Sequence, residues 1–283
     1  MSCIINKLLH KGLIPDAPLF LGTNVQYETI MGSYAFGVAD VTIKNKSSDI
    51  DVYGWAIPPK NFIYKHLTGY IPGFGQEPPG FDQYQKHHII EKSESQNENV
   101  EWDLNIYSII KFFNLCTENN PNILDSLFTP EECVVYCTKL GEMVRKERSL
   151  FLSKLYWKKI CGFAKTHMKK MTSKTSDGNR AEIIHKFGFD VKIAYHIVRL
   201  FDQAEQIMLD GTLDLQKASD LLKTLRRGEW TAEDVQKWVA AKEKNLNKIY
   251  DSSKMPEKPP YEPIRLLLLN CLEQFYGSME GFI

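Results

Sequence analysis

Two segments near the start of the chain combine strand patterns with residues suited to binding metal ions and phosphate. Residues 27–31 form a β-rich run that leads into Gly32 and Ser33, and Asp49 and Asp51 lie in a later run that alternates polar and apolar side chains. Because successive strand side chains point to opposite faces, the two aspartates share one face, with Cα atoms roughly 6–7 Å apart. Two such carboxylates can share a hard cation, and the N–H groups of a Gly-Ser turn can approach a phosphate closely. The sequence therefore predicts a site for a divalent cation and a phosphate group.

The composition is that of an ordinary folded protein. Of the 283 residues, 43% are hydrophobic and 25% are charged, so most of the chain is expected to fold. The formal net charge is zero, which excludes a uniformly basic nucleic-acid coat but leaves room for a local basic patch. No apolar run approaches the roughly 18 residues of a membrane span, and the cysteines are scattered. We therefore expect a cytoplasmic protein with reduced thiols and no membrane partner.

The chain divides into an α/β first half and a helical second half. Residues 99–106 alternate apolar and polar side chains, which predicts another half-buried strand with Asp103 on its polar face. Residues 58–98 are rich in Gly and Pro and predict a long loop or hairpin insertion over the mouth of the site. The remainder of the chain has helical periodicity. We therefore predict an α+β fold, with a mixed or antiparallel sheet in residues 1–135 and a helical domain in residues 136–283.

These motifs resemble those of a known enzyme superfamily. A Gly-Ser pair, a spacer and an Asp-x-Asp strand are the signature of DNA polymerase β-like nucleotidyltransferases, which residues 32–33 and 49–51 match. Residues 187–200 (FGFDVKIAYHIVRL) resemble a block of one polymerase β-like family, predicted nucleotidyltransferases linked to RNA repair in bacteria and phages. The RRGEW sequence at residues 226–230 resembles the element that follows that block. Together the matching segments span about residues 29–240.

The resemblance implies an N-terminal nucleotidyltransferase domain and a helical domain that closes over a nucleotide. It also implies a third catalytic carboxylate on a later strand, for which Asp103 is the candidate and Glu101 the substitute. Asp49, Asp51 and Asp103 would then bind two Mg²⁺ ions, for which Mn²⁺ can substitute. The turn at residues 32–33 would hold the phosphates of an NTP, which we take to be ATP. The implied reaction transfers an NMP to a hydroxyl acceptor and releases pyrophosphate.

The helical half contains two groups of basic residues. Lys192, His196 and Arg199 lie at i, i+4 and i+7, so they share one helix face, and three neighbouring cations favour an anion such as a triphosphate. Residues 139–192 contain 14 basic and 5 acidic residues, as expected for a surface that binds a polyanion. Within that span, the Tyr-Trp pair at residues 156–157 could stack on bases. Either group could also be solvated helix surface, and His196 could equally be a hydrogen-bonded core group. The basic span suits a polyanionic acceptor, which the family resemblance implies is RNA, with tRNA as one candidate.

Two other functions are compatible with the same residues. The site could transfer AMP to a protein hydroxyl, as antitoxin-like relatives in the superfamily do. Alternatively, the chain could bind nucleotide or RNA as a catalytically silent regulator. The presence of all three carboxylates argues against a silent protein, and the basic span favours RNA over protein as the acceptor.

Overall fold

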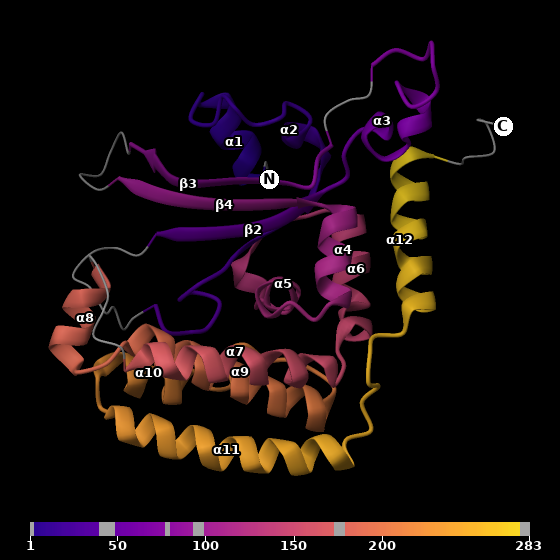
Figure 1. Ribbon diagram of the computed structural model, residues 1–283. Coiled ribbons are helices and arrows are strands. Elements are labelled where there is room, and N and C mark those ends of the chain that lie inside the picture. Colours follow the sequence, from indigo (N-terminus) through magenta and orange to yellow (C-terminus); the bar gives the residue numbers. More distant parts are fainter. Residues whose placement is uncertain (1–2, 40–48, 77–79, 93–98, 173–178, 278–283) are drawn as a thin grey trace.

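The strands form a mixed sheet with one parallel pair at its centre. The computed structural model describes residues 3–39, 49–76, 80–92, 99–172 and 179–277. Across these residues, five strands pair in the order β3-β4-β2-β1-β5 (Figure 1): β1 (Val25–Ile30), β2 (Ile50–Ala56), β3 (Gln83–Glu91), β4 (Val100–Ser108) and β5 (Val134–Cys137). β2 runs parallel to β4, and the other neighbouring pairs are antiparallel. The α+β fold with a mixed sheet is therefore confirmed.

Helices cover both faces of the sheet, which is why its central strands are apolar on both sides (Figure 1). Val52 of β2 and Leu104 of β4 are fully buried. The helices α1 (Ile4–His10) and α2 (Leu21–Asn24) cover one face, and α4 (Ile109–Thr117), α5 (Pro121–Leu127) and α6 (Lys139–Lys146) cover the other. A parallel pair needs a crossover connection, and here it contains α3 (Lys60–Ile63), the 3₁₀ helix η1 (Lys65–Leu67) and β3.

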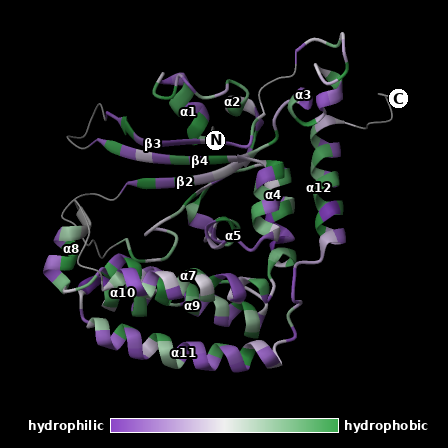
Figure 2. Ribbon diagram, viewed as in Figure 1, coloured by the Kyte–Doolittle hydropathy of each residue, from purple (hydrophilic) through white to green (hydrophobic). Residues whose placement is uncertain are grey.

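A layer of longer helices packs beyond α5 on the second face of the sheet (Figure 1). It contains α7 (Leu155–Met171), α8 (Asn179–Phe187), α9 (Val191–Asp210), α10 (Ser219–Arg227) and α11 (Ala232–Ser252). α9 lies at its centre, in contact with α7, α10 and α11. α11 is the outermost of these helices and is largely hydrophilic (Figure 2).

The remaining helices close the side of the molecule. α12 (Tyr261–Tyr276) packs beside α4 and α6, and the 3₁₀ helices η2 (Glu131–Cys133) and η3 (Arg148–Phe151) flank β5 and α6. Within the ranges described above, no helix has the length and apolar composition needed to span a bilayer.

Local sequence signals set both ends of α9. The side chain of Asp190 accepts hydrogen bonds from the backbone N–H groups of Lys192 and Ile193, at 3.0 and 3.1 Å, and so caps the first turn. Gly211 ends the helix with a φ of +64°, which glycine adopts without strain. Both ends of α9 are therefore determined by residues next to it in the sequence.

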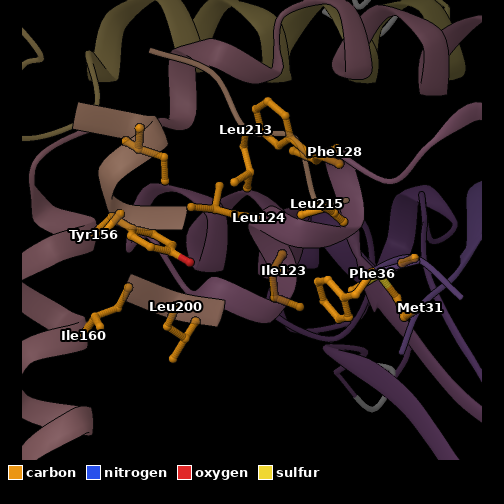
Figure 3. Packing of buried hydrophobic residues seen from close by; sticks show 14 of the residues in the cluster. Met31, Phe36, Ile123, Leu124, Phe128, Tyr156, Ile160, Leu200, Leu213 and Leu215 are labelled. Atoms are coloured by element: carbon orange, nitrogen blue, oxygen red, sulfur yellow. The ribbon is translucent and has the colours of Figure 1, made fainter. Parts of the chain in front are cut away.

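The main hydrophobic cluster joins the sheet to the helical layer. It includes Tyr27 of β1 and Ile197 of α9, both almost completely buried. Figure 3 shows Met31 and Phe36, from the turn after β1, beside Ile123 of α5. The turn that carries the predicted phosphate-binding residues is thus anchored in the core on its apolar side. The cluster contains residues from both predicted domains, whose boundary remains a prediction.

Only one part of the described segment within residues 58–98 lies near the predicted site. This region contains the edge strand β3, and its α3–η1 segment lies beside α12 at the opposite end of the sheet (Figure 1). The hydroxyl of Tyr276 donates a hydrogen bond to the carbonyl of Pro58, and the rings of Tyr64 and Tyr276 lie 5.9 Å apart. Pro58 follows the C-terminal end of β2, whereas the aspartates are at its N-terminal end. The predicted insertion over the site is therefore wrong for the α3–η1 segment, whereas β3 is a strand of the sheet that borders the site. Residues 77–79 and 93–98 lie outside the described part.

The predicted stacking residues of α7 are also placed differently. Tyr156 and Trp157 are 1% and 3% exposed, and the indole N–H of Trp157 donates to Asn247 of α11 at 3.1 Å. They cannot stack on an external base, because the apolar face of α7 is wide enough to include both rings. Residues 173–178 of the basic span lie outside the described ranges.

Candidate active site

Asp51 and Asp103 lie side by side on the two parallel strands. They are register partners in the pairing of β2 with β4, and neighbouring strands are about 4.8 Å apart. Paired positions of adjacent strands project from the same face, so the two carboxylates are neighbours. Asp49 is exposed and comes directly before β2, at the same end of the sheet. The fold therefore gathers the three predicted catalytic carboxylates.

The repulsion among these carboxylates affects their protonation. Burial, followed by the charges of Asp103 and Asp49, raises the pKa of Asp51 to about 6. Burial and the charges of Glu101 and Asp103 also raise the pKa of Asp49. Carboxylates that destabilise one another in this way are stabilised by a nearby divalent cation.

The turn after β1 is in close contact with the carboxylate of Asp51. The N–H of Met31 donates to the backbone carbonyl of Asp51 at 2.8 Å. Gly32 has a φ of +69°, and a Cβ at this position would lie 2.5 Å from Asp51 Oδ2. Only glycine fits both the backbone angle and the space. The half-buried Ser33 accepts a hydrogen bond at its carbonyl from the N–H of Val38, at 2.9 Å.

A cavity of about 220 Å³ opens beside these residues. Its walls come from the turn after β1, from β2, from α5 and from α9: Met31, Gly32, Phe36, Asp51, Tyr53, Asn122, His196 and Arg199. Of the predicted nucleotide-binding residues, the cavity brings together Gly32, His196 and Arg199. Ser33 and Lys192 are not among the described residues that line it.

On α9, the side chains of His196 and Arg199 are in contact, and only that of Arg199 is charged. Nη2 of Arg199 lies 3.0 Å from Nδ1 of His196, and it must donate because a guanidinium has no acceptor. Burial and the charge of Arg199 lower the pKa of His196 to about 3, so the imidazole is neutral at neutral pH. The expectation of three cations on this face is therefore wrong at His196. Lys192 is exposed on the first turn of the helix.

Comparison with the sequence profiles of known families identifies the family of this chain. The sequence profile of the RNA repair pathway DNA polymerase beta family matches residues 19–257. The chain belongs to this family. The match includes every labelled strand and the helices from α2 to α11. The suspected family is confirmed, and the chain is grouped with the polymerase β-like nucleotidyltransferases.

Comparison with individual proteins gives more distant similarity. No curated protein matches the sequence significantly. Among solved structures, the chain is similar to a nucleotidyltransferase-like protein from Exiguobacterium sibiricum, with a TM-score of 0.32 and 9% sequence identity. That similarity covers 95% of this chain and 73% of the other.

Two histidines of β3 that the sequence did not predict contact the carboxylate of Asp103. Nδ1 of His87 lies 3.0 Å from Asp103 Oδ2, and the backbone N–H of His88 donates to Asp103 Oδ1 at 2.8 Å. Nδ1 of His88 also lies 2.5 Å from Glu101 Oε1. A β-bulge between residues 86 and 89 turns both histidines toward β4. The absence of Gly and Pro from residues 83–91, after a segment rich in both, was the sequence signal for this strand.

The carboxylates have the right chemistry for Mg²⁺ but are not pre-arranged as a complete metal site. Within the described ranges, no group of three or more His, Cys, Asp or Glu side chains has the arrangement of metal ligands. Asp103 uses both of its oxygens for contacts with His87 and His88. Carboxylate oxygens nevertheless suit Mg²⁺ and Mn²⁺, and the mutual repulsion at Asp51 favours a cation there. The residues therefore fit a divalent cation in donor type and charge.

Proposed function

We propose that the protein is a Mg²⁺-dependent nucleotidyltransferase that transfers an NMP from an NTP to a hydroxyl at an RNA end. The observation that carries this proposal is the pairing of Asp51 with Asp103, beside the turn at Gly32 and across the cavity from Arg199. Carboxylates that hold cations and a guanidinium that binds phosphate suit a metal-bound triphosphate between them. The description of the family supports RNA as the acceptor, and this support is by analogy.

The two walls of the cavity have different roles in this proposal. Asp49, Asp51 and Asp103 would hold two Mg²⁺ ions, or Mn²⁺ in their place. When bound, Mg²⁺ neutralises charge on the phosphates and lowers the pKa of the acceptor hydroxyl. On the opposite wall, Arg199 and the remaining N–H of His196 would donate to phosphate oxygens. The backbone of the turn at residues 32–33 would hold the leaving phosphates, with Lys192 at the rim.

The proposed reaction is a substitution at the α-phosphorus. The acceptor oxygen forms a bond to this phosphorus, and the bond from the phosphorus to the bridging oxygen of the β-phosphate breaks. The electron pair of that bond leaves with pyrophosphate, and Asp103 accepts the proton of the hydroxyl. Asp51 would keep its position during this step, because its strand lies in the interior of the sheet.

The test is transfer of label from each α-³²P-labelled NTP, with Mg²⁺ or Mn²⁺, into a mixture of small RNA and cell protein. Wild-type protein should give labelled RNA that nuclease destroys, and Asp51→Asn should give none. Asp251→Asn is the matched control, because this aspartate is exposed on α11, away from the cavity, and should retain full activity.

The other possible outcomes would each contradict a different part of this proposal. Label that protease removes would identify a protein as the acceptor and replace the RNA proposal. Equal labelling by wild-type and Asp51→Asn proteins would contradict the assignment of the site. No labelling with any NTP, across acceptors that include tRNA, would favour a regulator without catalytic activity.

A further inference from the structure

Four buried polar side chains form a chain of contacts behind the cavity wall. The hydroxyl of Tyr156 on α7 donates to Gln203 Oε1 at 2.7 Å, and Gln203 Nε2 donates to Asp125 Oδ1 at 3.0 Å. Asp125 Oδ2 then lies 3.6 Å from Nη2 of Arg199. All four residues are at most 6% exposed, and Figure 3 shows the hydroxyl of Tyr156 directed into the packed interior. Burying two opposite charges in this way costs free energy that apolar residues would not, so the arrangement calls for a functional reason.

The contact between Asp125 and Arg199 is incomplete. A distance of 3.6 Å is longer than a hydrogen bond between nitrogen and oxygen. Among the described residues, neither Asp125 Oδ2 nor Arg199 Nε has a hydrogen-bond partner, and both atoms are buried. Buried polar atoms of this kind usually have partners in native proteins. Arg199 therefore has donor capacity that none of the described residues uses, and its side chain lines the cavity.

The position of the guanidinium is defined from two further directions. Its Cζ lies 4.0 Å from the centre of the Phe36 ring, which belongs to the turn that begins at Gly32. On the other side, it donates to Nδ1 of His196, so the proton of this neutral imidazole is on Nε2. Arg199 and His196 therefore present only N–H donors to the cavity, and an anion with several acceptor oxygens is complementary to them.

We propose that Asp125 and Gln203 are positioning residues that hold the guanidinium of Arg199 against Phe36, so that its unused donors receive a phosphate group of the bound ligand. The identity of that ligand as a nucleoside triphosphate rests on the proposed function. The positioning itself rests on the contacts of the four side chains.

The test is a double-mutant cycle with inorganic tripolyphosphate as the probe, measured by calorimetry with and without Mg²⁺. Asp125→Asn keeps the size of the side chain but places an amide opposite Arg199, and it should weaken tripolyphosphate binding about tenfold. Arg199→Ala should weaken binding at least as much. The double variant should bind no more weakly than Arg199→Ala, because Asp125 acts through the guanidinium. Additive losses in the double variant would overturn the proposal, as would wild-type affinity in Asp125→Asn.

Two further variants separate positioning from folding. Asp202→Asn is the matched control: this aspartate is on α9 and, like Asp125, accepts a hydrogen bond from a glutamine, Gln206, at 2.7 Å. It should leave tripolyphosphate binding unchanged. Phe36→Leu replaces the ring that contacts Arg199 with another apolar side chain. It provides a second test of positioning if Asp125→Asn does not fold. It should weaken binding several-fold in the wild-type background and have no effect in Arg199→Ala; an equal loss in both backgrounds would overturn the proposal.

The binding assay does not depend on nucleotidyl transfer. If the cycle behaves as expected but no NTP is transferred, the proposed function fails and the positioning of Arg199 stands. If label is transferred but Arg199→Ala binds tripolyphosphate as wild type does, the positioning proposal fails alone. Failure of the folded wild-type protein to bind tripolyphosphate at all would also overturn it.

Discussion

The contact between Gly32 and Asp51 gives the sharpest prediction, because the chain contains a matched control for it. Gly32 and Gly12 have almost the same backbone angle, with φ values of +69° and +67°. A Cβ at residue 32 would lie 2.5 Å from Asp51 Oδ2, whereas a Cβ at residue 12 would meet nothing within 4 Å. Gly32→Ala and Gly12→Ala therefore introduce the same backbone strain, but only the first displaces the carboxylate.

The magnitudes follow from these values. The positive φ costs an alanine about 1–2 kcal/mol at either site, and the reduced freedom of the unfolded chain offsets about 0.4–1 kcal/mol of this. The net loss of about 1 kcal/mol should lower the Tm of both variants by roughly 2–4 °C. At residue 32, Asp51 Oδ2 must also move by about 0.9 Å to reach an ordinary contact of 3.4 Å (3.4 − 2.5). A displacement of this size in a catalytic group can reduce the rate by about 100-fold.

The assays are thermal unfolding, Mn²⁺ binding by electron paramagnetic resonance, and nucleotidyl transfer. The two alanine variants should unfold within a few degrees of each other. Gly32→Ala should transfer label about 100-fold more slowly than Gly12→Ala and bind Mn²⁺ more weakly. Equal transfer rates and equal Mn²⁺ affinities in the two variants would refute the reasoning, because the displaced carboxylate would then have no role at the site.

Three further predictions concern pH, metal binding and RNA. Burial raises the pKa of Glu28 from 4.5 to about 7, so the folded state holds a proton that the unfolded state has lost. The free energy of unfolding should therefore fall by up to about 3 kcal/mol between pH 4.5 and pH 7 (2.5 pH units at about 1.36 kcal/mol each). In urea titrations, Glu28→Gln should abolish this pH dependence. The same pH dependence in both proteins would contradict the role of Glu28. His87→Ala should raise Mn²⁺ affinity by at most about fivefold, because it releases one oxygen of Asp103 from a partly exposed contact. Weaker Mn²⁺ binding by this variant would mean that the imidazole is a metal ligand. Replacing the exposed Lys165 and Lys169 with Gln should lower the salt dependence of RNA binding by about one unit per lysine, and an unchanged slope would exclude this face of α7.

The parts of the site that local patterns encode could be predicted from the sequence. The alternation around Asp51 and Asp103 identified two strands, because one polar face on a buried strand has a period of two. That these strands are neighbours and parallel is a property of the whole sheet. The family resemblance implied only that a third carboxylate lies on a later strand. The end of α9 was predictable because Gly211 provides the positive φ that ends a helix.

The contacts that depend on packing between distant segments could not be predicted. His87 reaches Asp103 only because a β-bulge in the edge strand turns it there, and its strand follows a segment dense in Gly and Pro. A buried partner for Asp125 was easier to predict from the sequence. This carboxylate lies within the apolar run of residues 123–128, and a buried carboxylate must have a partner. The sequence does not identify that partner, Arg199, because it lies on a helix that packs against α5 only in the folded protein. Similarly, the neutrality of His196 follows from its burial, which helical periodicity alone does not give.

The arrangement of charge explains why the site lies between the sheet and α9. The sheet places Asp49 and Asp103 beside Asp51, which lines the cavity, and without cations these carboxylates would repel a triphosphate. The wall formed by α9 attracts phosphate through Arg199 but cannot neutralise the repulsion at the other side. In the proposed function, a cation would bind the carboxylates and a phosphate would bind Arg199, so the cavity would suit the complex of both. Phe36 of the turn after β1 and Ile197 of α9 belong to the same hydrophobic cluster, so packing in the core holds the turn and the helix side by side.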